Sequence, residues 1–345
     1  MAERLQRILA VMFLESLQVL REPATLSLIF LVPILQVVLF GFAVRPLPGD
    51  VSVAVARPAG ALARVDQVLQ RGALTVVADH LGPGEAEVMA RQGLCLLALE
   101  YHSGVTVVIV NDLEPLLAQH ALSVLATSDS TRPAEPVVVR RLYNPSNRSD
   151  WSVVAPLSGL VVMISMLMLG ALSLVREREM GTWEPLLTTP LASWEALCGK
   201  ILPYFILSLL QTVALEICLL YCFDLPIQQH FGPFLVFAQI HALAYLCLGL
   251  AISGLAKSQL QAVQGAVLFY IPSILLSGFL LPYGNMPDWA QRIGNLLPFC
   301  HYVRASRATL LGGSAPSFLT QEGIPVAIFA LLAAALAGWV YRRRL

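Results

Sequence analysis

The sequence predicts a polytopic α-helical membrane protein with six transmembrane helices and an α/β domain inserted between the first and second of them. Hydrophobic residues make up 57% of the 345 residues, charged residues only 13%, and the mean hydropathy is +0.71. Soluble domains contain about 25% charged residues, so this composition is typical of a membrane protein. Six apolar runs reach the length of about 20 residues that a bilayer requires. They lie at 23–44, 153–175, 201–223, 233–255, 262–282 and 324–341.

The N-terminal residues 1–22 predict an amphipathic helix that lies on the membrane surface. Leu5, Leu9 and Met12 fall near helical spacing, whereas Arg7 and Glu15 lie off this apolar stripe. A charged face opposite an apolar stripe is typical of helices at the membrane interface.

Residues 45–150 differ in composition from the apolar runs and predict an α/β domain, because strand and helix patterns alternate there. Strands are expected at 51–56, 74–78, 94–100, 105–110 and 137–142, and helices at 61–71, 84–92 and 115–127. The domain contains no glycine-rich phosphate loop. Its histidines are isolated, and the six cysteines of the chain show neither zinc-ligand spacing nor a disulfide framework. No metal site is expected.

Basic residues near the ends of the apolar runs predict the orientation, because cytoplasmic loops carry an excess of Lys and Arg. One side carries Arg4, Arg7, Arg21, Arg176, Arg178, Lys200, Lys257 and Arg342–Arg344. The short loops of the other side carry Arg292, Arg304 and Arg307. We therefore expect both termini in the cytoplasm and the 45–150 domain in the periplasm, on a multi-pass protein of the bacterial inner membrane. The net charge of zero gives no indication of nucleic-acid binding.

The polar segment 176–200 joins the second and third apolar runs. Its first four residues, Arg176–Glu179, are all charged and cannot remain in hydrocarbon. Such a loop is a suitable place to bind another protein, although it could also be a connector without a partner. Its pattern comprises Glu177-Arg178-Glu179, Gly181-Thr182, Glu184, Leu186-Leu187, Pro190, Glu195, Gly199-Lys200 and Pro203-Tyr204. This pattern resembles the cytoplasmic loop of ABC-2 type transporter permeases.

The resemblance implies that the loop carries a coupling helix that docks on a separate ATP-binding subunit. The residues assigned to coupling are Arg176, Glu177, Arg178, Glu179, Gly181, Thr182, Glu184, Pro190, Glu195, Gly199 and Lys200. It also implies a second permease chain, identical or related, that completes a dimer in the lipid bilayer. Family members with a large outer domain often work with a periplasmic adaptor, or membrane-fusion protein, which is a further expected partner.

A second resemblance to this family lies before the last apolar run, in the outer loop 283–323 and the residues that lead into it. It rests on Ser277-Gly278-Phe279, Pro282, Asn285-Met286-Pro287, Trp289, Gln291, Leu297-Pro298, Tyr302 and Arg307. In the family this segment forms short helices that dip back into the outer leaflet. The aromatic and apolar content of the loop independently favours an interfacial position. Its candidate functional residues are Pro282, Met286, Pro287, Trp289, Pro298 and Arg307.

The chain lacks the pattern of a nucleotide-binding site. A P-loop requires G-x-x-x-x-G-K-[ST], whose backbone amides hold the phosphates. Gly199-Lys200 has no glycine at the required upstream position and is followed by Ile201. We therefore expect a transport subunit that is not itself an enzyme and has no cofactor of its own, with ATP and Mg²⁺ bound to the partner subunit.

Two ionisable residues, Glu216 and His241, lie inside predicted spans. Each is seven or eight residues from the outer end of its helix, a depth of about 10–12 Å at a rise of ~1.5 Å per residue. Charges at this depth usually have a partner or a cavity. The two residues could therefore pair, or line a translocation path with Gln211 and Gln239. Alternatively, they form structural hydrogen bonds with these glutamines or with the backbone.

Together these features predict the permease subunit of an ABC-2 type exporter for a drug, a lipid or another small amphiphile. Two other classes stay open. In a membrane sensor, the 45–150 domain would bind a ligand, but every expected cytoplasmic segment is short. A proton-coupled secondary transporter would depend on Glu216 and His241 and would show inverted repeats. No such repeats are recognisable in the sequence.

Overall fold

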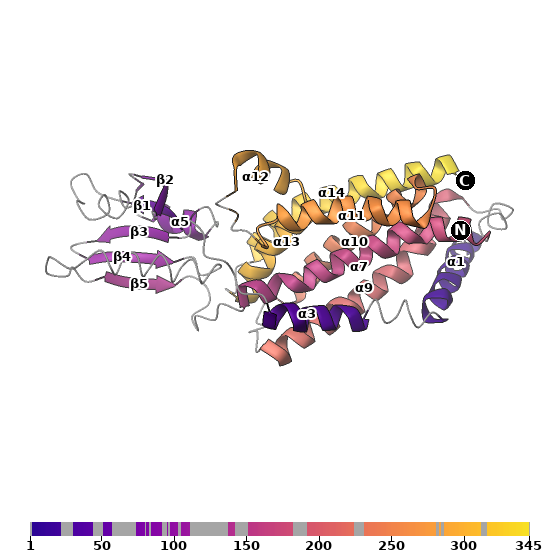
Figure 1. Cartoon of the computed structure of the whole chain (residues 1–345), viewed down its shortest axis with the longest axis horizontal. Helices are drawn as coiled ribbons and strands as arrows, with labels where there is room; N and C mark the ends of the chain where they lie inside the picture. Colours follow the sequence, from indigo (N-terminus) through magenta and orange to yellow (C-terminus); the bar gives the residue numbers. More distant parts are fainter. Residues whose placement is uncertain are drawn as a thin grey trace. The chain divides into compact units, whose positions relative to one another are not determined.

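The structure of the chain, a computed structural model, consists of two compact units (Figure 1). A helical unit contains Met1–Ala43, Val154–Phe279 and Arg292–Leu345, and a second unit contains Val44–Val153 and Leu280–Gln291. The residues described are 2–21, 30–43, 51–56, 74–79, 81–82, 84–91, 95, 97–102, 105–110, 137–141, 151–181, 192–223, 231–280, 283, 286–311 and 316–344.

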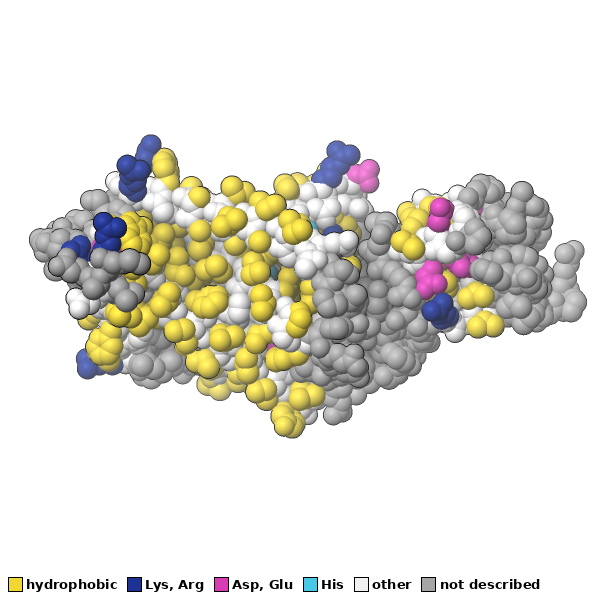
Figure 2. Space-filling view, turned by 180° about the vertical axis from the view of Figure 1, so that it is seen from behind, with side chains coloured by type: hydrophobic (Ala, Val, Ile, Leu, Met, Phe, Trp, Pro, Cys, Tyr) yellow, Lys and Arg dark blue, Asp and Glu magenta, His cyan; other side chains and the backbone are white. Residues whose placement is uncertain are grey.

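Four long helices dominate the helical unit. They are α7 (Trp151–Glu179), α9 (Ser193–Phe223), α10 (Phe231–Leu255) and α14 (Pro316–Arg344). Each contains a stretch long and apolar enough to cross a membrane, which confirms four of the six predicted spans as helices. Hydrophobic side chains cover much of the face of this unit that Figure 2 shows. Leu331 and Leu332 of α14 are 71% and 65% exposed, as expected for a surface in contact with lipid or another chain.

The other two predicted spans are not established as spans. The described part of the first consists of α3 (Val32–Ala43) and the residues just before it, and 22–29 lie outside the described residues. The fifth, α11 (Gln259–Leu275), has 17 residues and ends seven residues before the predicted boundary at 282. A turn follows it, in which Gly278 adopts a positive φ of 79°. That conformation suits glycine and cannot continue a helix.

The helices flanking the predicted polar connection extend farther into it than expected. The α7 helix continues through the four charges to Glu179, and α9 begins at Ser193 rather than at 201. The backbone N–H of Ala192 donates to the Glu195 carboxylate at 3.1 Å, and a glutamate at this position satisfies the open end of a helix. Gly181, at a φ of 72°, follows the end of α7, where glycine commonly terminates helices. The polar connection between the two helices is therefore shorter than predicted.

Glycines allow α7 and α10 to approach closely. A Cβ atom on Gly249 would lie 2.4 Å from the carbonyl oxygen of Leu167, and one on Gly170 would lie 2.6 Å from that of Leu246. Small residues at such crossings let helix backbones pack directly in membrane proteins. Both chain termini lie at the same end of the helical unit (Figure 1).

The second unit contains a five-stranded sheet in the order β2-β1-β3-β4-β5. The strands are β1 (Val51–Ala56), β2 (Leu74–Ala78), β3 (Leu97–His102), β4 (Val105–Val110) and β5 (Val137–Arg141). The β3–β4 pair is antiparallel and the other three pairs are parallel. All five predicted strands are present, although β3 begins three residues later than predicted. The predicted helices at 61–71 and 115–127 lie outside the described residues.

The helix α5 (Glu85–Arg91) covers part of the sheet and was also predicted. Its Ala86 and Ala90 pack in a core with Ala54, Ala98 and Ile109 of the strands. The buried Glu100 carboxylate accepts hydrogen bonds from the backbone N–H groups of Gly84 and Glu87, at 3.1 and 3.3 Å. Its negative charge therefore stabilises the N-terminal end of α5.

We expect Gly249→Ala to destabilise the helical unit, because the added methyl group would clash with the α7 backbone. Overpacking of this kind costs about 1–3 kcal/mol. The measurement is the Tm of the detergent-solubilised chain. Gly232→Ala in the same helix is the matched control, because no atom lies within 4 Å of its added Cβ. Equal Tm values for the two variants would contradict this account of the crossing.

Candidate functional site

The N-terminal helix α1 (Ala2–Arg21) packs against the first turns of α9. At the crossing, a Cβ on Gly199 would lie 2.6 Å from the Cβ of Val11 and 3.2 Å from the carbonyl oxygen of Ile8. Glycine at 199 therefore permits the two helices to approach. Phe13 and Leu14 of α1 stay 64% and 57% exposed. This distribution agrees with the expected amphipathic helix, with one exception.

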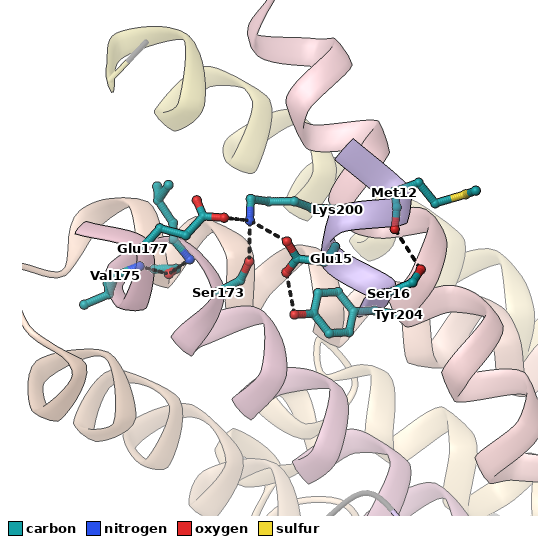
Figure 3. Close-up of polar contacts among 10 residues, drawn as sticks. Met12, Glu15, Ser16, Ser173, Val175, Glu177, Lys200 and Tyr204 are labelled. Atoms are coloured by element: carbon teal, nitrogen blue, oxygen red, sulfur yellow. Dashed lines mark hydrogen bonds and ion pairs between the residues drawn. The ribbon is translucent and has the colours of Figure 1, made fainter. Parts of the chain in front are cut away.

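The exception is Glu15, which is buried rather than in contact with water. It lies in a cluster with Lys200 and Tyr204 of α9 and with Glu177 of α7 (Figure 3). The Lys200 ammonium contacts Glu15 Oε2 at 3.0 Å and Glu177 Oε1 at 2.6 Å. Glu15 lies off the apolar stripe of α1 but is buried, because its carboxylate compensates the buried positive charge of Lys200.

Every donor of the Lys200 ammonium has an acceptor. Besides the two carboxylates, Ser173 Oγ of α7 lies 3.3 Å from Nζ. The Tyr204 hydroxyl donates to Glu15 Oε1 at 2.6 Å. The Lys200 side chain is 1% exposed. A buried ammonium is tolerated only with such complete pairing, because its desolvation is costly.

The remaining charges at the end of α7 contact the connection between α10 and α11. Arg178 Nη1 donates to the carbonyl oxygen of Ala256 at 3.4 Å. Glu179 accepts from the backbone N–H of Gln259 at 2.8 Å and from its side-chain amide at 2.5 Å. Because Gln259 begins α11, the Glu179 charge lies at the positive end of that helix dipole. These side chains therefore have structural partners within the chain.

Other predicted coupling residues have different positions. Glu195 contacts Arg7 of α1 at 3.8 Å, in addition to its contact with Ala192. Arg176 lies in the last turn of α7 and is partly exposed. Thr182, Glu184 and Pro190 lie outside the described residues. The docking role of this segment stays a prediction.

The two glutamines of the candidate translocation path form hydrogen bonds between helices. Gln239 of α10 accepts from the Ser208 hydroxyl of α9 at 2.9 Å, and its amide donates to Thr212 at 3.3 Å. The amide of Gln211 of α9 donates to Ser165 of α7 at 2.9 Å. The partners of both glutamines are therefore hydroxyl groups on neighbouring helices rather than Glu216 or His241.

Glu216 and His241 do not form the direct pair that was considered. His241 Nε2 lies 3.3 Å from the carbonyl oxygen of Gly159, and its ring packs on Tyr302 with a centroid distance of 4.5 Å. The hydroxyl of Ser158 approaches the Glu216 carboxyl, but neither carboxyl oxygen forms a well-directed hydrogen bond with a described residue. Glu216 is only 1% exposed. A buried carboxyl without a firm partner is unusual and is a candidate for function.

Tyr302 lies at the centre of this region. Its hydroxyl is 3.1 Å from that of Ser158, and a Cβ on Gly159 would lie 2.0 Å from its ring. Glycine at 159 is therefore required for the ring to occupy this position. Its ring also lies within an aromatic group formed by Phe234, Phe237, His241, Tyr245, Phe299 and Tyr302.

The predicted outer loop contains two short helices and a π-helical turn before α14. They are α12 (Asp288–Gly294), α13 (Pro298–Ser306) and η3 (Arg307–Leu311). Pro298 is buried at the first position of α13, where its missing N–H costs nothing. Arg307 is buried and donates to the carbonyl oxygen of Gly278 at 3.2 Å. The short helices agree with the family pattern, whereas their depth in a membrane stays a prediction.

The other predicted residues of this loop differ in exposure. Met286 is buried, and its carbonyl oxygen accepts from the Gln291 amide at 2.8 Å. Pro287 is exposed and Trp289 is 62% exposed, which suits an interfacial side chain. Pro282 lies outside the described residues.

A charged group that the sequence did not indicate links α13 to α14. His301 Nδ1 lies 2.6 Å from Glu322 Oε2, and His301 Nε2 lies 2.9 Å from the carbonyl oxygen of Asn295. Arg304 is 3.7 Å from the same glutamate. Glu322 lies two residues before the predicted start of the last span, and a glutamate beside a long apolar run is the signal that could have identified it.

We expect Glu322→Ala to lower the free energy of unfolding by about 2–4 kcal/mol, because it leaves His301 and Arg304 without their carboxylate. Gln321→Ala, an exposed neighbour in the same helix, is the control and should stay within about 0.5 kcal/mol of the parent. Thermal unfolding in detergent measures both. If Glu322→Ala unfolds at the same temperature as the control, the group does not hold α13 against α14.

Comparison with known proteins identifies the family to which the helical part of the chain is similar. Residues 137–311, about half of the chain, match the family described as ABC-2 type transporter. The matched segment contains α7, α9, α10 and the short helices before α14, and thus Lys200, Glu216 and Tyr302.

Curated relatives extend the similarity over nearly the whole chain. The probable multidrug ABC transporter permease YbhR of Escherichia coli is 25% identical over 94% of this chain and 95% of its own length. The probable multidrug ABC transporter permease YbhS of the same organism is 22% identical over 99% and 98%. The inner membrane transport permease YhhJ of E. coli is 27% identical over 59% and 56%. The helices, the short outer helices and these similarities together place the chain in the ABC-2 type transporter family.

Proposed function

We propose that this chain is the membrane-spanning permease subunit of an ATP-driven exporter. The observation that carries the proposal is the similarity over nearly the full length to two proteins named as multidrug ABC transporter permeases. The cargo would be a drug, a lipid or another small amphiphile, moved out of the cytoplasm or the inner leaflet. ATP and Mg²⁺ would bind to a separate subunit.

The connection between α7 and α9 would dock on that subunit. Its two ends are held inside the helical unit through Glu177, Glu179, Glu195 and Lys200. The residues between 182 and 191 would therefore provide most of the docking contacts, with Glu184 as the acidic group that meets a basic surface. The docking residues expected from the sequence also include Glu177 and Glu179. Because these two side chains contact other parts of the chain, the proposed docking surface leaves them out.

The assembly would contain a second permease chain, identical or related, and the exposed apolar side chains would face that chain or lipid. Both termini would lie in the cytoplasm and the 45–150 unit in the periplasm of a bacterial cell. A periplasmic adaptor is a further proposed partner. The basic side chains Arg342 and Arg343, which are exposed at the end of α14, support this orientation.

The first experiment captures the tagged chain from detergent-solubilised native membranes and measures ATP hydrolysis in the eluate. The parent chain should bring down an ATPase, and Glu184→Arg should reduce the captured activity at least about tenfold, as expected for a charge reversed at an interface. Asp288→Arg, which changes an exposed acidic residue of the outer segment, should leave the activity unchanged. If no ATPase accompanies the parent, the permease assignment fails and a sensor is favoured.

A second experiment tests the candidate translocation path in cells that carry the chain and its ATPase. We expect Glu216→Gln to lower the efflux of ethidium, a cationic amphiphile, at least about tenfold, the effect of losing about 1.4 kcal/mol of favourable interaction. The amount of ATPase captured should not change. Cys222→Ser, an exposed position in the same helix, is the control. Unchanged efflux in Glu216→Gln would remove this carboxyl from the path.

The same assay separates ATP-driven from proton-driven export. Efflux should persist when a protonophore collapses the proton gradient while ATP is maintained. If efflux stops under these conditions and in Glu216→Gln, the proton-coupled alternative is favoured.

A further inference from the structure

The Lys200 ammonium joins three separate parts of the chain. Glu15 comes from α1, Glu177 and Ser173 come from α7, and Lys200 itself is on α9 (Figure 3). Glu15 and Lys200 are 185 residues apart in the sequence, and Glu177 and Lys200 are 23 residues apart. One side chain therefore holds the N-terminal helix against both helices that flank the polar connection.

The position of these residues along the helices is informative. Glu177 lies in the last turn of α7, and Lys200 lies in the second turn of α9. The connection follows the end of α7 at Glu179, close to Glu177, and precedes the start of α9 at Ser193, two turns before Lys200. Any movement of the connection would therefore reach the ammonium, and through it α1.

The contacts between α1 and α9 support a joint motion of the two helices. Val11 packs directly on Gly199, one residue before Lys200. Arg7, one turn before Val11, contacts Glu195 of α9. Glu15, one turn after Val11, contacts Lys200 and Tyr204. The same face of α1 thus contacts α9 at three successive turns, and two of these contacts are ionic.

Charged groups fix the position of α1 against α7 and α9 more closely than apolar groups would. Apolar contacts are non-directional, whereas three directed hydrogen bonds from one ammonium hold a helix in one register. Apolar side chains of similar volume would often stabilise a protein as well as a buried ion group does. The presence of the ions therefore indicates a positional requirement in addition to stability.

We propose that Lys200 is a positioning residue that makes α1 and the two ends of the α7–α9 connection move as one body. The proposal rests on the proposed function in one respect, namely that the connection is the place where the ATPase subunit acts. Displacement of the connection by that subunit is then transmitted to α1 through the Glu15–Lys200–Glu177 cluster.

The position of α1 can be measured without any partner. Val11→Cys, in a chain in which Cys198, Cys218 and Cys222 are changed to Ala, places a thiol in the α1–α9 contact. The other three native cysteines, Cys95, Cys247 and Cys300, are buried. The rate at which a maleimide labels Cys at position 11 in the detergent-solubilised full chain reports how often α1 separates from α9.

We expect Lys200→Met to accelerate this labelling at least about tenfold, because the buried Glu15 and the partly buried Glu177 lose the cation that they share. Lys257→Met, which removes an exposed lysine, is the matched control and should leave the rate unchanged. The double variant Glu15→Gln/Lys200→Met removes the unpaired charge on α1. It replaces the single variant in the assay if that variant unfolds, and we expect it to label faster than the parent because the directed contacts are gone.

Coupling is measured on the complex captured with its ATPase. In the double variant, we expect ATP hydrolysis per bound ATPase subunit to fall several-fold, while the amount of bound subunit stays the same. A purely structural role of Lys200 predicts parental hydrolysis once the fold is retained.

Two results would overturn the proposal. Labelling as slow as in the parent, for both Lys200 variants, would show that the cluster does not position α1. Faster labelling with unchanged hydrolysis per bound subunit would show that the position of α1 is irrelevant to coupling. Absence of any captured ATPase would refute the proposed function instead, and the labelling rates would still decide whether Lys200 positions α1.

Discussion

The packing of α1, α7 and α9 at one end of the helical unit depends on one ammonium that is buried between two carboxylates. A charge removed from water must be paired completely, and Lys200 uses its three donors on Glu15, Ser173 and Glu177. Because of this requirement, the charged end of α7 and the first turns of α9 pack within the helical unit. The same requirement also explains why a helix with exposed apolar side chains directs a glutamate into the protein rather than into water.

The same constraint operates at other places in the chain, with different outcomes. His301 and Arg304 share the Glu322 carboxylate and so join α13 to α14. The side-chain NH₂ groups of Gln211 and Gln239 donate to hydroxyl groups on neighbouring helices. Glu216 is the contrasting case, because it is buried beside Ser158 without a well-directed hydrogen bond. A buried carboxyl with both oxygens in this state is a reasonable place to look for function.

Family membership and the structure contribute different information. The family match covers residues 137–311 and thus includes Glu177, Lys200 and Glu216, whereas Glu15 and Glu322 lie outside it. The similarity to YbhS, which extends over 99% of this chain, also reaches α1 and α14. The ion clusters therefore connect the family segment to the helices that precede and follow it.

Local patterns in the sequence determined the five strands, the helix α5 and four long apolar helices, because side-chain periodicity and apolar length are properties of a short segment. The family pattern likewise identified the polar connection and the short outer helices. The tertiary structure alone decided that Glu15 pairs with Lys200, that Tyr302 packs on Gly159, and that Glu216 and His241 do not pair. A buried charge requires a partner, but which residue supplies it depends on contacts between segments that are far apart in the sequence.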